Sequence, residues 1–175
     1  VTERRLWLSR VAGVLGGLVK VDRSCGVHVH IGLKAPNQAF GDEGVYTYDE
    51  ARMIACKTSV LYTAFQAAIN QLVPRSRHNQ TYSHPNRGLL NYAYHHVVSK
   101  GEEGQDLWAE VLFRHARDTR YYHVNVTTVR KYGTIEFRQH AGSTNPVKLD
   151  AWTQLMSAIL ARAATISHSE MYSVP

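Results

Sequence analysis

Strict alternation runs through residues 24–33, which read SCGVHVHIGL. Because successive side chains of a β-strand point to opposite faces, this stretch predicts a strand with one aliphatic face and one face that carries His28 and His30 between two glycines. Two imidazoles placed in this way lie roughly 6–7 Å apart along the backbone. They can share a metal ion or the phosphates of a nucleotide. A pair of solvent-facing histidines on an ordinary strand is the alternative.

A second strand with a polar face is predicted near the C-terminus. The stretch TIEFRQH, residues 134–140, places Glu136, Arg138 and His140 on one face and two apolar side chains on the other. A carboxylate can hold Mg²⁺, and an arginine fork can bind a phosphate through two hydrogen bonds. An exposed ion pair of little energetic value is the alternative. If the polar faces of both strands align in one sheet, a single site results.

Two further segments carry cationic and hydrogen-bonding groups. Arg77 lies in RSRHN, residues 75–79, a composition that suits an anion-binding loop, although a solvated basic loop explains it more simply. Arg120 and Asn125 lie at the start of a β-rich run. Alternation along this run places Asn125 on the same face as Tyr121 and His123.

The rest of the chain predicts helices around these strands. Thr47 and Glu50 fit a capping box at the start of the longest helix. Two β-rich runs are joined by a short segment that contains a glycine, which predicts a hairpin. One α+β domain follows, in which helices pack on an antiparallel sheet. The expected helices span residues 3–19, 47–72, 89–97, 105–117 and 146–164, and the expected hairpin spans residues 121–129 and 134–140.

Charge and composition narrow the classes of partner. The net charge of +6 and the pI near 9.4 favour anionic partners, such as nucleotide phosphates, acidic metabolites or nucleic acid. No apolar run approaches the ~20 residues of a membrane helix, so a cytoplasmic or phage-borne location is expected. Cys25 and Cys56 provide no disulfide framework; reduced thiols are expected, and a single bridge stays open.

Four blocks of the sequence together resemble the amidoligase family, the carboxylate–amine ligases related to glutamine synthetase and γ-glutamylcysteine synthetase. The blocks are residues 24–32, 76–79, 120–125 and 133–138, and their order and approximate spacing agree with the family. The resemblance implies a curved antiparallel sheet of the glutamine-synthetase catalytic type, with helices packed on its outer face. It implies that ATP and divalent metal ions, Mg²⁺ or Mn²⁺, bind on the concave face. The implied reaction makes an acyl phosphate from ATP and a carboxylate, which an amine then converts to an amide.

The resemblance also assigns roles to single residues. His30 and Glu136 resemble the metal ligands of the family. His28, His30, Arg138 and Asn125 resemble the groups that contact the nucleotide. Arg138 further resembles the arginine that contacts the transferring phosphate.

Two more arginines resemble residues of the family, and one feature of the sequence departs from it. Arg77 and Arg120 resemble further contacts to phosphate or to the substrate carboxylate. Family members begin with a strand of alternating acidic residues, and no such strand precedes Ser24. Residues 1–175 are therefore expected to form the C-terminal portion of one glutamine-synthetase-like domain. This departure has three alternative explanations: the chain is a fragment or a processed product, a partner chain supplies the acidic strand, or the fold is reused without catalysis.

Two hypotheses from other classes compete with a ligase. A structural module, such as a phage virion component, or a nucleic-acid-binding module would use the basic loop and the tyrosines, and it predicts salt-sensitive binding to nucleic acid. A metal-dependent hydrolase built on the paired histidines is disfavoured, because an amidohydrolase barrel needs a much longer chain. An oligomer or larger assembly is expected in either case, since an incomplete sheet edge favours association.

Overall fold

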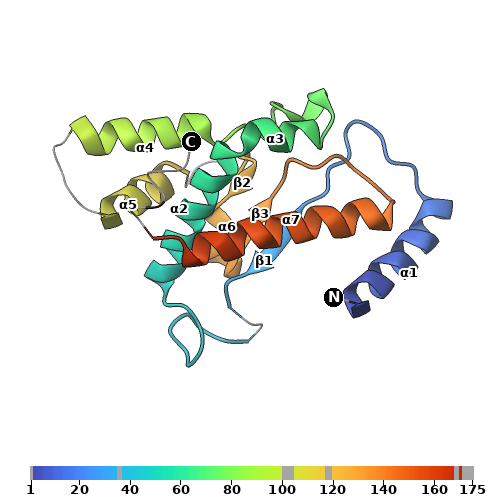
Figure 1. Cartoon of the computed structure of the whole chain (residues 1–175), viewed down its shortest axis with the longest axis horizontal. Coiled ribbons are helices and arrows are strands. Elements are labelled where there is room, and N and C mark those ends of the chain that lie inside the picture. Colours follow the sequence, from blue (N-terminus) through green and yellow to red (C-terminus); the bar gives the residue numbers. More distant parts are fainter. Residues whose placement is uncertain (1, 35–36, 100–104, 117–119, 168–169, 171–175) are drawn as a thin grey trace.

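The computed structural model describes residues 2–34, 37–99, 105–116, 120–167 and 170, and it combines helices with a small antiparallel sheet. The class predicted from the sequence, α+β, is confirmed at this level. The elements are shown in Figure 1. In chain order they are α1 (Thr2–Leu18), β1 (Val29–Gly32), α2 (Tyr48–Ala64), α3 (Gln66–Gln71), a 3₁₀ turn (Arg75–Arg77), α4 (Arg87–Ser99), α5 (Gln105–Ala116), β2 (Val124–Asn125), α6 (Thr127–Tyr132), β3 (Thr134–Phe137) and α7 (Pro146–Thr165).

The sheet has three strands in the order β1-β3-β2, so that β3 lies in the middle. Both neighbours run antiparallel to β3. Glu136 of β3 is paired with His30 on one side and with Asn125 on the other. The two polar strand faces predicted from the sequence are therefore aligned on one face of one sheet.

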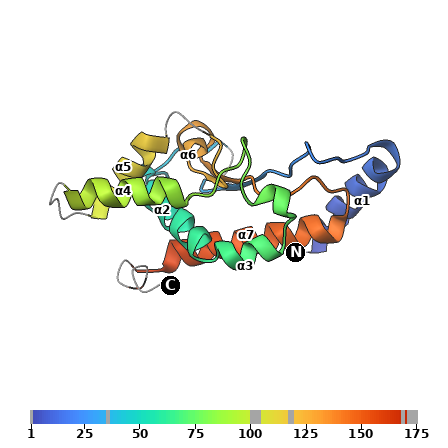
Figure 2. The ribbon, with the colours of Figure 1, turned by 90° about the horizontal axis from the view of Figure 1, so that it is seen from above.

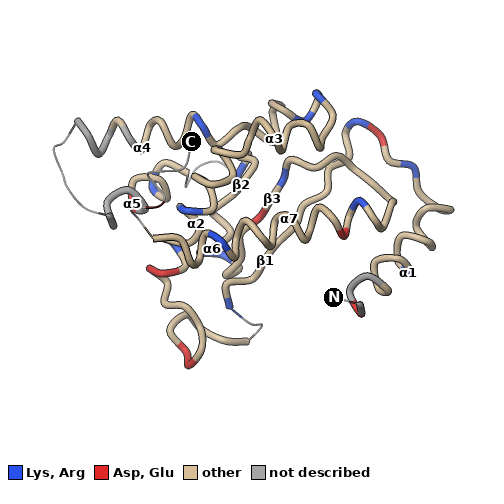
Figure 3. Tube along the Cα trace, viewed as in Figure 1, with Lys and Arg blue, Asp and Glu red and all other residues tan. Residues whose placement is uncertain are grey.

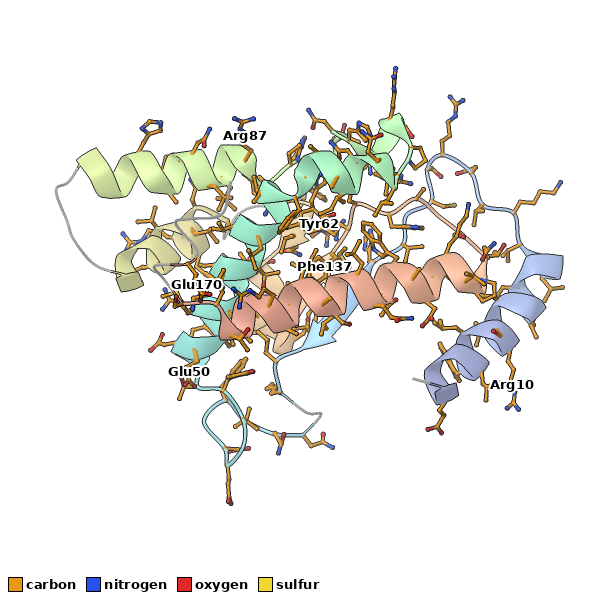
Figure 4. All side chains as sticks on the ribbon, viewed as in Figure 1. Arg10, Glu50, Tyr62, Arg87, Phe137 and Glu170 are labelled. Atoms are coloured by element: carbon orange, nitrogen blue, oxygen red, sulfur yellow. The ribbon has the colours of Figure 1, made fainter. Side chains whose placement is uncertain are left out.

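The opposite face of the sheet packs against α2 and α7. Ile135 and Phe137 are fully buried there, and the rings of Phe137 and Tyr62 are 5.9 Å apart. Figure 4 shows Tyr62 and Phe137 in the interior, and Figure 2 shows α7 and α3 below the strands. Burial of a large apolar side chain contributes about 2–3 kcal/mol, so this core fixes which strand face is left for the polar residues.

The prediction of a hairpin is wrong, because a helix connects the two β-rich runs. Residues 127–132 form the helix α6, and only Val124 and Asn125 of the first run pair with β3. The Asn125 side-chain oxygen accepts hydrogen bonds from the Thr127 N–H (3.0 Å) and hydroxyl (2.7 Å), which turns the chain out of the strand. Gly133 ends the helix with φ of 66° and returns the chain to β3.

Two other predicted elements differ in length. The strand predicted at residues 24–33 is regular only from Val29 to Gly32, and the preceding part is joined to the sheet by one bridge between Gly26 and Ala141. The helix predicted at residues 47–72 breaks at Phe65 into α2 and α3.

The remaining helices agree with the sequence analysis. The capping box of Thr47 and Glu50 is present, and α1, α4, α5 and α7 occupy the predicted positions. Residue 117, at the end of the helix predicted at 105–117, lies outside the described residues.

The helix α1 lies at the edge of the molecule beside one end of α7 (Figure 1). Its Ala12 is buried, whereas Trp7 and Leu18 are exposed. Within the described ranges, every helix is too short or too polar to span a membrane. Cys25 and Cys56 are free thiols, and burial raises the pKa of Cys56 to about 12.

Candidate active site

The carboxylate of Glu136 is the centre of a cluster built from all three strands and the residues next to them. Its Oε1 lies 2.9 Å from His28 Nδ1, 3.5 Å from His30 Nε2 and 2.7 Å from Arg138 Nη1. Its Oε2 accepts a hydrogen bond of 2.7 Å from Asn125 Nδ2. Four of the residues predicted as site residues thus converge on the carboxylate of a fifth, Glu136.

Strand alternation and one glycine make this convergence possible. His28 and His30 lie two residues apart and face the same side as Glu136, as the alternation predicted. Gly26 leaves space beside them, because a Cβ atom there would lie 3.3 Å from Arg77 Nη1 and 3.5 Å from His28 Nε2. A larger residue at this position would crowd both side chains.

The donors around Glu136 keep it ionised in spite of its burial. Burial raises the pKa of this carboxyl, but hydrogen bonds from His28 and Asn125 and the charge of Arg138 lower it, and the resulting pKa is about 2. The negative charge is therefore present at neutral pH and is already balanced by the guanidinium of Arg138.

The cluster is open to solvent on the histidine side. The side chains of His28 and His30 are each 41% exposed, whereas that of Glu136 is 6% exposed. Thr134 Oγ1 lies 3.0 Å from His30 Nδ1 and so orients this ring with its Nε2 toward Glu136. The two imidazoles are therefore the part of the cluster that solvent reaches.

Arg138 is held on several sides. It is 8% exposed, its Nε donates to the main-chain oxygen of Tyr82 at 3.4 Å, and its guanidinium lies 5.9 Å from the centre of the Tyr121 ring. The guanidinium of Arg120 lies 5.4 Å from the same ring. Arg120 therefore stands one aromatic ring away from Arg138. Tyr121 was not among the site residues predicted from the sequence, although its position next to Arg120 was a signal.

Arg77 lies at the border of the cluster and contacts the main chain. It is buried, and its Nη2 donates to the carbonyl oxygens of Arg23 (3.2 Å) and Cys25. These bonds hold the segment that leads into β1. Arg77 is close to His28 across Gly26, so that the structure places it beside the site and not on Glu136.

Two histidines predicted to share the polar face lie elsewhere. His140 packs against Trp152 with ring centres 4.9 Å apart, and its Nδ1 lies 2.6 Å from the Ala141 oxygen. His123 is fully buried against Tyr62 and Gln66. In both cases the residue lies outside a regular strand, so the alternation of strand faces no longer determines its direction.

His123 belongs to a buried polar network that the sequence analysis missed. Its Nδ1 lies 3.1 Å from Gln66 Oε1, and Gln139 Oε1 accepts from Tyr62 (2.7 Å) and Gln66 (3.1 Å). Asn70 accepts from Gln139 at 2.7 Å. Gln66 and Asn70, spaced by one helical turn, were the available signal. Burial lowers the pKa of His123 to about 4, so the ring is neutral at pH 7.

The arrangement of the side chains around Glu136 can be compared with the ligand sets that hold metal ions. Among the residues that the structure describes, no group of three or more His, Cys, Asp or Glu side chains is arranged to hold a metal ion. Every contact of Glu136 given above is made by a nitrogen donor. The cluster as it stands is one buried carboxylate within a set of cationic and neutral donors.

Comparison with known proteins identifies the family. The family model described as "Putative amidoligase enzyme" matches residues 16–160, a range that covers most of the chain and contains the whole Glu136 cluster. No curated protein and no solved structure matches the chain. The chain belongs to this amidoligase family.

Proposed function

We propose that the chain is the nucleotide-binding and ligating part of a carboxylate–amine ligase, and that ATP binds at the Glu136 cluster. The observation that carries the proposal is the convergence of His28, His30, Arg138 and Asn125 on Glu136. Membership of the amidoligase family supports the reaction class. The nucleotide, the metal and the route through an acyl phosphate are parts of the proposal.

A glutamine-synthetase-type sheet is part of the same proposal. Such a sheet requires helices on one face and the site on the other. The three strands found here have α2 and α7 on one face and the Glu136 cluster on the other, which is compatible with that arrangement.

The charges of the cluster suit a polyphosphate. Arg138 balances Glu136, and Arg120 adds a guanidinium one ring away. Arg77 adds another beside His28. Positioned guanidinium groups stabilise the charge that develops on a transferring phosphoryl group, and their effect is largest where water is excluded. Arg138 is buried and is paired directly with Glu136, and it is therefore the residue we assign to the transferring phosphate.

The proposed reaction has two steps. An oxygen of the substrate carboxylate attacks the γ-phosphorus of ATP, the bond from that phosphorus to the bridging oxygen breaks, and ADP leaves. The amine nitrogen then attacks the acyl carbon, phosphate leaves with the bonding electron pair, and the amine loses a proton. The side chains of the cluster bind and orient the reactants in both steps, and none of them forms a covalent bond.

A divalent ion would be held at this cluster by few protein ligands and would need phosphate oxygens to complete its coordination. Mg²⁺ is commonly bound by one or two carboxylates together with substrate phosphates, and imidazole suits Mn²⁺ better. Glu136 and His30 would hold the ion, and the ion would neutralise charge on the phosphates. An acidic strand from a partner chain would supply further ligands of the kind that the family uses.

Calorimetric titration with ATP and Mg²⁺ tests nucleotide binding. We expect the wild type to bind and Glu136→Gln to bind at least about tenfold more weakly, because it loses the charge that aligns both imidazoles and Arg138. Glu43→Gln, an exposed carboxylate in the loop before α2, is the matched control and should bind like the wild type. Equal binding by Glu136→Gln, or no binding by a folded wild type, would contradict the proposal.

Trapping with hydroxylamine tests the ligase reaction. Hydroxylamine is a small amine that converts an acyl phosphate to a hydroxamate, so ATP-dependent hydroxamate formation from a panel of carboxylates would support the acyl-phosphate route. ATP binding without hydroxamate or phosphate release would indicate a fold reused without catalysis. Salt-sensitive nucleic-acid binding in place of ATP binding would favour the structural alternative.

A further inference from the structure

A cavity of about 570 Å³ lies outside the Glu136 cluster, between α2, α5 and α6. Figure 3 shows Lys and Arg positions on these helices where they meet. The volume is within the range of sites that bind small molecules. Most of the side chains that line it are arginines and aromatic residues of these three helices. The arginines contribute positive charge, and the aromatic rings form part of the wall.

Three guanidinium groups line the cavity: Arg52 of α2, Arg114 of α5 and Arg130 of α6. Arg52 pairs with Asp49 at 3.1 Å through Nη1, and Arg114 pairs with Glu110 through Nη2. Each pair uses one guanidinium nitrogen, although an arginine has five N–H donors. Within the described ranges, no carboxylate lies within ion-pair distance of Arg130.

Both ion pairs are of the kind that a ligand can replace. The side chain of Asp49 is 84% exposed and that of Glu110 is 50% exposed. Pairs of this type contribute little to stability, since water screens them and two flexible side chains must be ordered. A multivalent anion that contacts several guanidinium groups at once gains more than either acid does.

Aromatic rings hold one of the arginines in place. The guanidinium of Arg52 lies 5.8 Å from the centre of the Tyr48 ring and 5.4 Å from that of Phe113, and its side chain is 22% exposed. Tyr48 is itself supported edge-on by Phe40, with ring centres 5.6 Å apart. An arginine ordered before binding loses less freedom when the ligand arrives, which favours affinity.

We propose that this cavity binds a small phosphate ester at a site separate from the Glu136 cluster. Arginine forks match the geometry of phosphate oxygens, and three of them on one cavity suit a multivalent phosphate better than a single carboxylate. The cavity also touches the site network. Thr127 lines it, and the same residue donates two hydrogen bonds to Asn125, which holds Glu136. A molecule bound in the cavity would therefore lie next to Thr127, which is hydrogen-bonded to the residue that holds Glu136.

Calorimetry with inorganic pyrophosphate, in buffer without divalent metal, tests the separate site. The titration uses the Arg138→Gln protein, in which the Glu136 cluster is impaired, after its folding is checked by circular dichroism. Pyrophosphate should still bind. Adding Arg114→Gln and Arg130→Gln, at two exposed positions, should weaken binding at least about tenfold.

A matched double variant controls for total charge. Lys131→Gln and Arg162→Gln also remove two positive charges, and both residues lie outside the cavity lining. This control should change the affinity less than about twofold. Equal weakening by both double variants, or no binding of pyrophosphate to the Arg138→Gln protein, would overturn the proposal. So would much tighter binding of a single-stranded oligonucleotide that both double variants weaken equally, since that indicates a diffuse nucleic-acid surface.

Discussion

Glu136 shows how a buried carboxylate stays charged at the scale of a single residue. Burial alone would favour the neutral acid. His28, Asn125 and Arg138 reverse this preference because each donates to one of the two carboxylate oxygens. The same donors are the residues that the proposed ligand would contact, so stability and binding depend on one set of hydrogen bonds.

Replacing Glu136 by Gln should remove part of the acid sensitivity of the fold. The folded pKa of about 2 lies below the ordinary 4.5, so the unfolded chain takes up the proton first as the pH falls. The stability is complete above about pH 4.5 and is lost progressively toward pH 2. Between pH 6 and pH 3 the wild type should lose about 2 kcal/mol more than Glu136→Gln, measured as the free energy of unfolding in urea. An equal loss in both proteins would show that the carboxylate is not held as described.

His123 should control stability in a different range of pH. Its folded pKa of about 4 lies below the ordinary 6.5, so the unfolded chain binds a proton that the folded chain does not. Stability should therefore fall as the pH drops from about 6.5 to 4, by about 2 kcal/mol between pH 7 and pH 5. His123→Gln should lack this loss, whereas His115→Gln, on the exposed side of α5, should retain it. Urea titrations at both pH values decide between these outcomes.

The short helix α6 shows what local bonds do at the scale of an element. Its residues include several that favour strands, yet the strand ends at Asn125, whose side-chain oxygen accepts from the main-chain N–H and the hydroxyl of Thr127. The hydroxyl of Thr128 lies within hydrogen-bond distance of the main-chain oxygens of Asn125 (3.1 Å) and Thr134 (2.8 Å), and so links both ends of the connection. The helix thereby sets where β2 ends and β3 begins, and so aligns Asn125 with Glu136.

Gly133→Ala should destabilise this connection. Gly133 has φ of 66°, and an added Cβ would lie 2.6–2.9 Å from side-chain carbons of Lys34. We expect a loss of about 1–2 kcal/mol in the free energy of unfolding, since the left-handed conformation is unfavourable for alanine and Lys34 must move. Gly88→Ala in α4, where nothing lies within 4 Å, is the control and should be neutral or slightly stabilising. A neutral Gly133→Ala would refute the structural role given to this glycine.

At the scale of the whole molecule, stability is concentrated in one core beneath the sheet. The main cluster of buried apolar residues joins β3, α2 and α7, and α1 contributes none of its members. Within α1, Ala12 is buried, but Trp7, Val14 and Leu18 are more than half exposed. The site and the core therefore share the sheet, while α1 packs against one end of α7 and none of its described residues belongs to the main apolar cluster.

Removal of residues 1–18 should leave a cooperatively folded protein. We expect one unfolding transition with a midpoint within about 5 °C of the wild type, measured by circular dichroism, because the main core is intact. Phe137→Ala in the full chain provides the contrast and should cost about 3–5 kcal/mol. Loss of a cooperative transition in the shortened chain would mean that α1 supports the core more than its burial indicates.

The sequence by itself determined the elements whose signals are local. Alternation predicted that His28 and His30 share a face, and that Glu136 and Arg138 share another, because the period of a strand depends on neighbouring residues alone. Helical spacing and the capping box of Thr47 and Glu50 predicted the helices for the same reason. The family followed from four short blocks.

Only the tertiary structure decided which of these residues meet. The pairing of His30 with Glu136 joins residues far apart in the chain, and apolar burial against α2 and α7 selects the face that they share. The inward turn of His123 and the main-chain anchoring by Arg77 depend on partners that no local pattern names. Long-range packing therefore converted two polar strands into one site, because it alone sets how strands from distant parts of the chain are placed side by side.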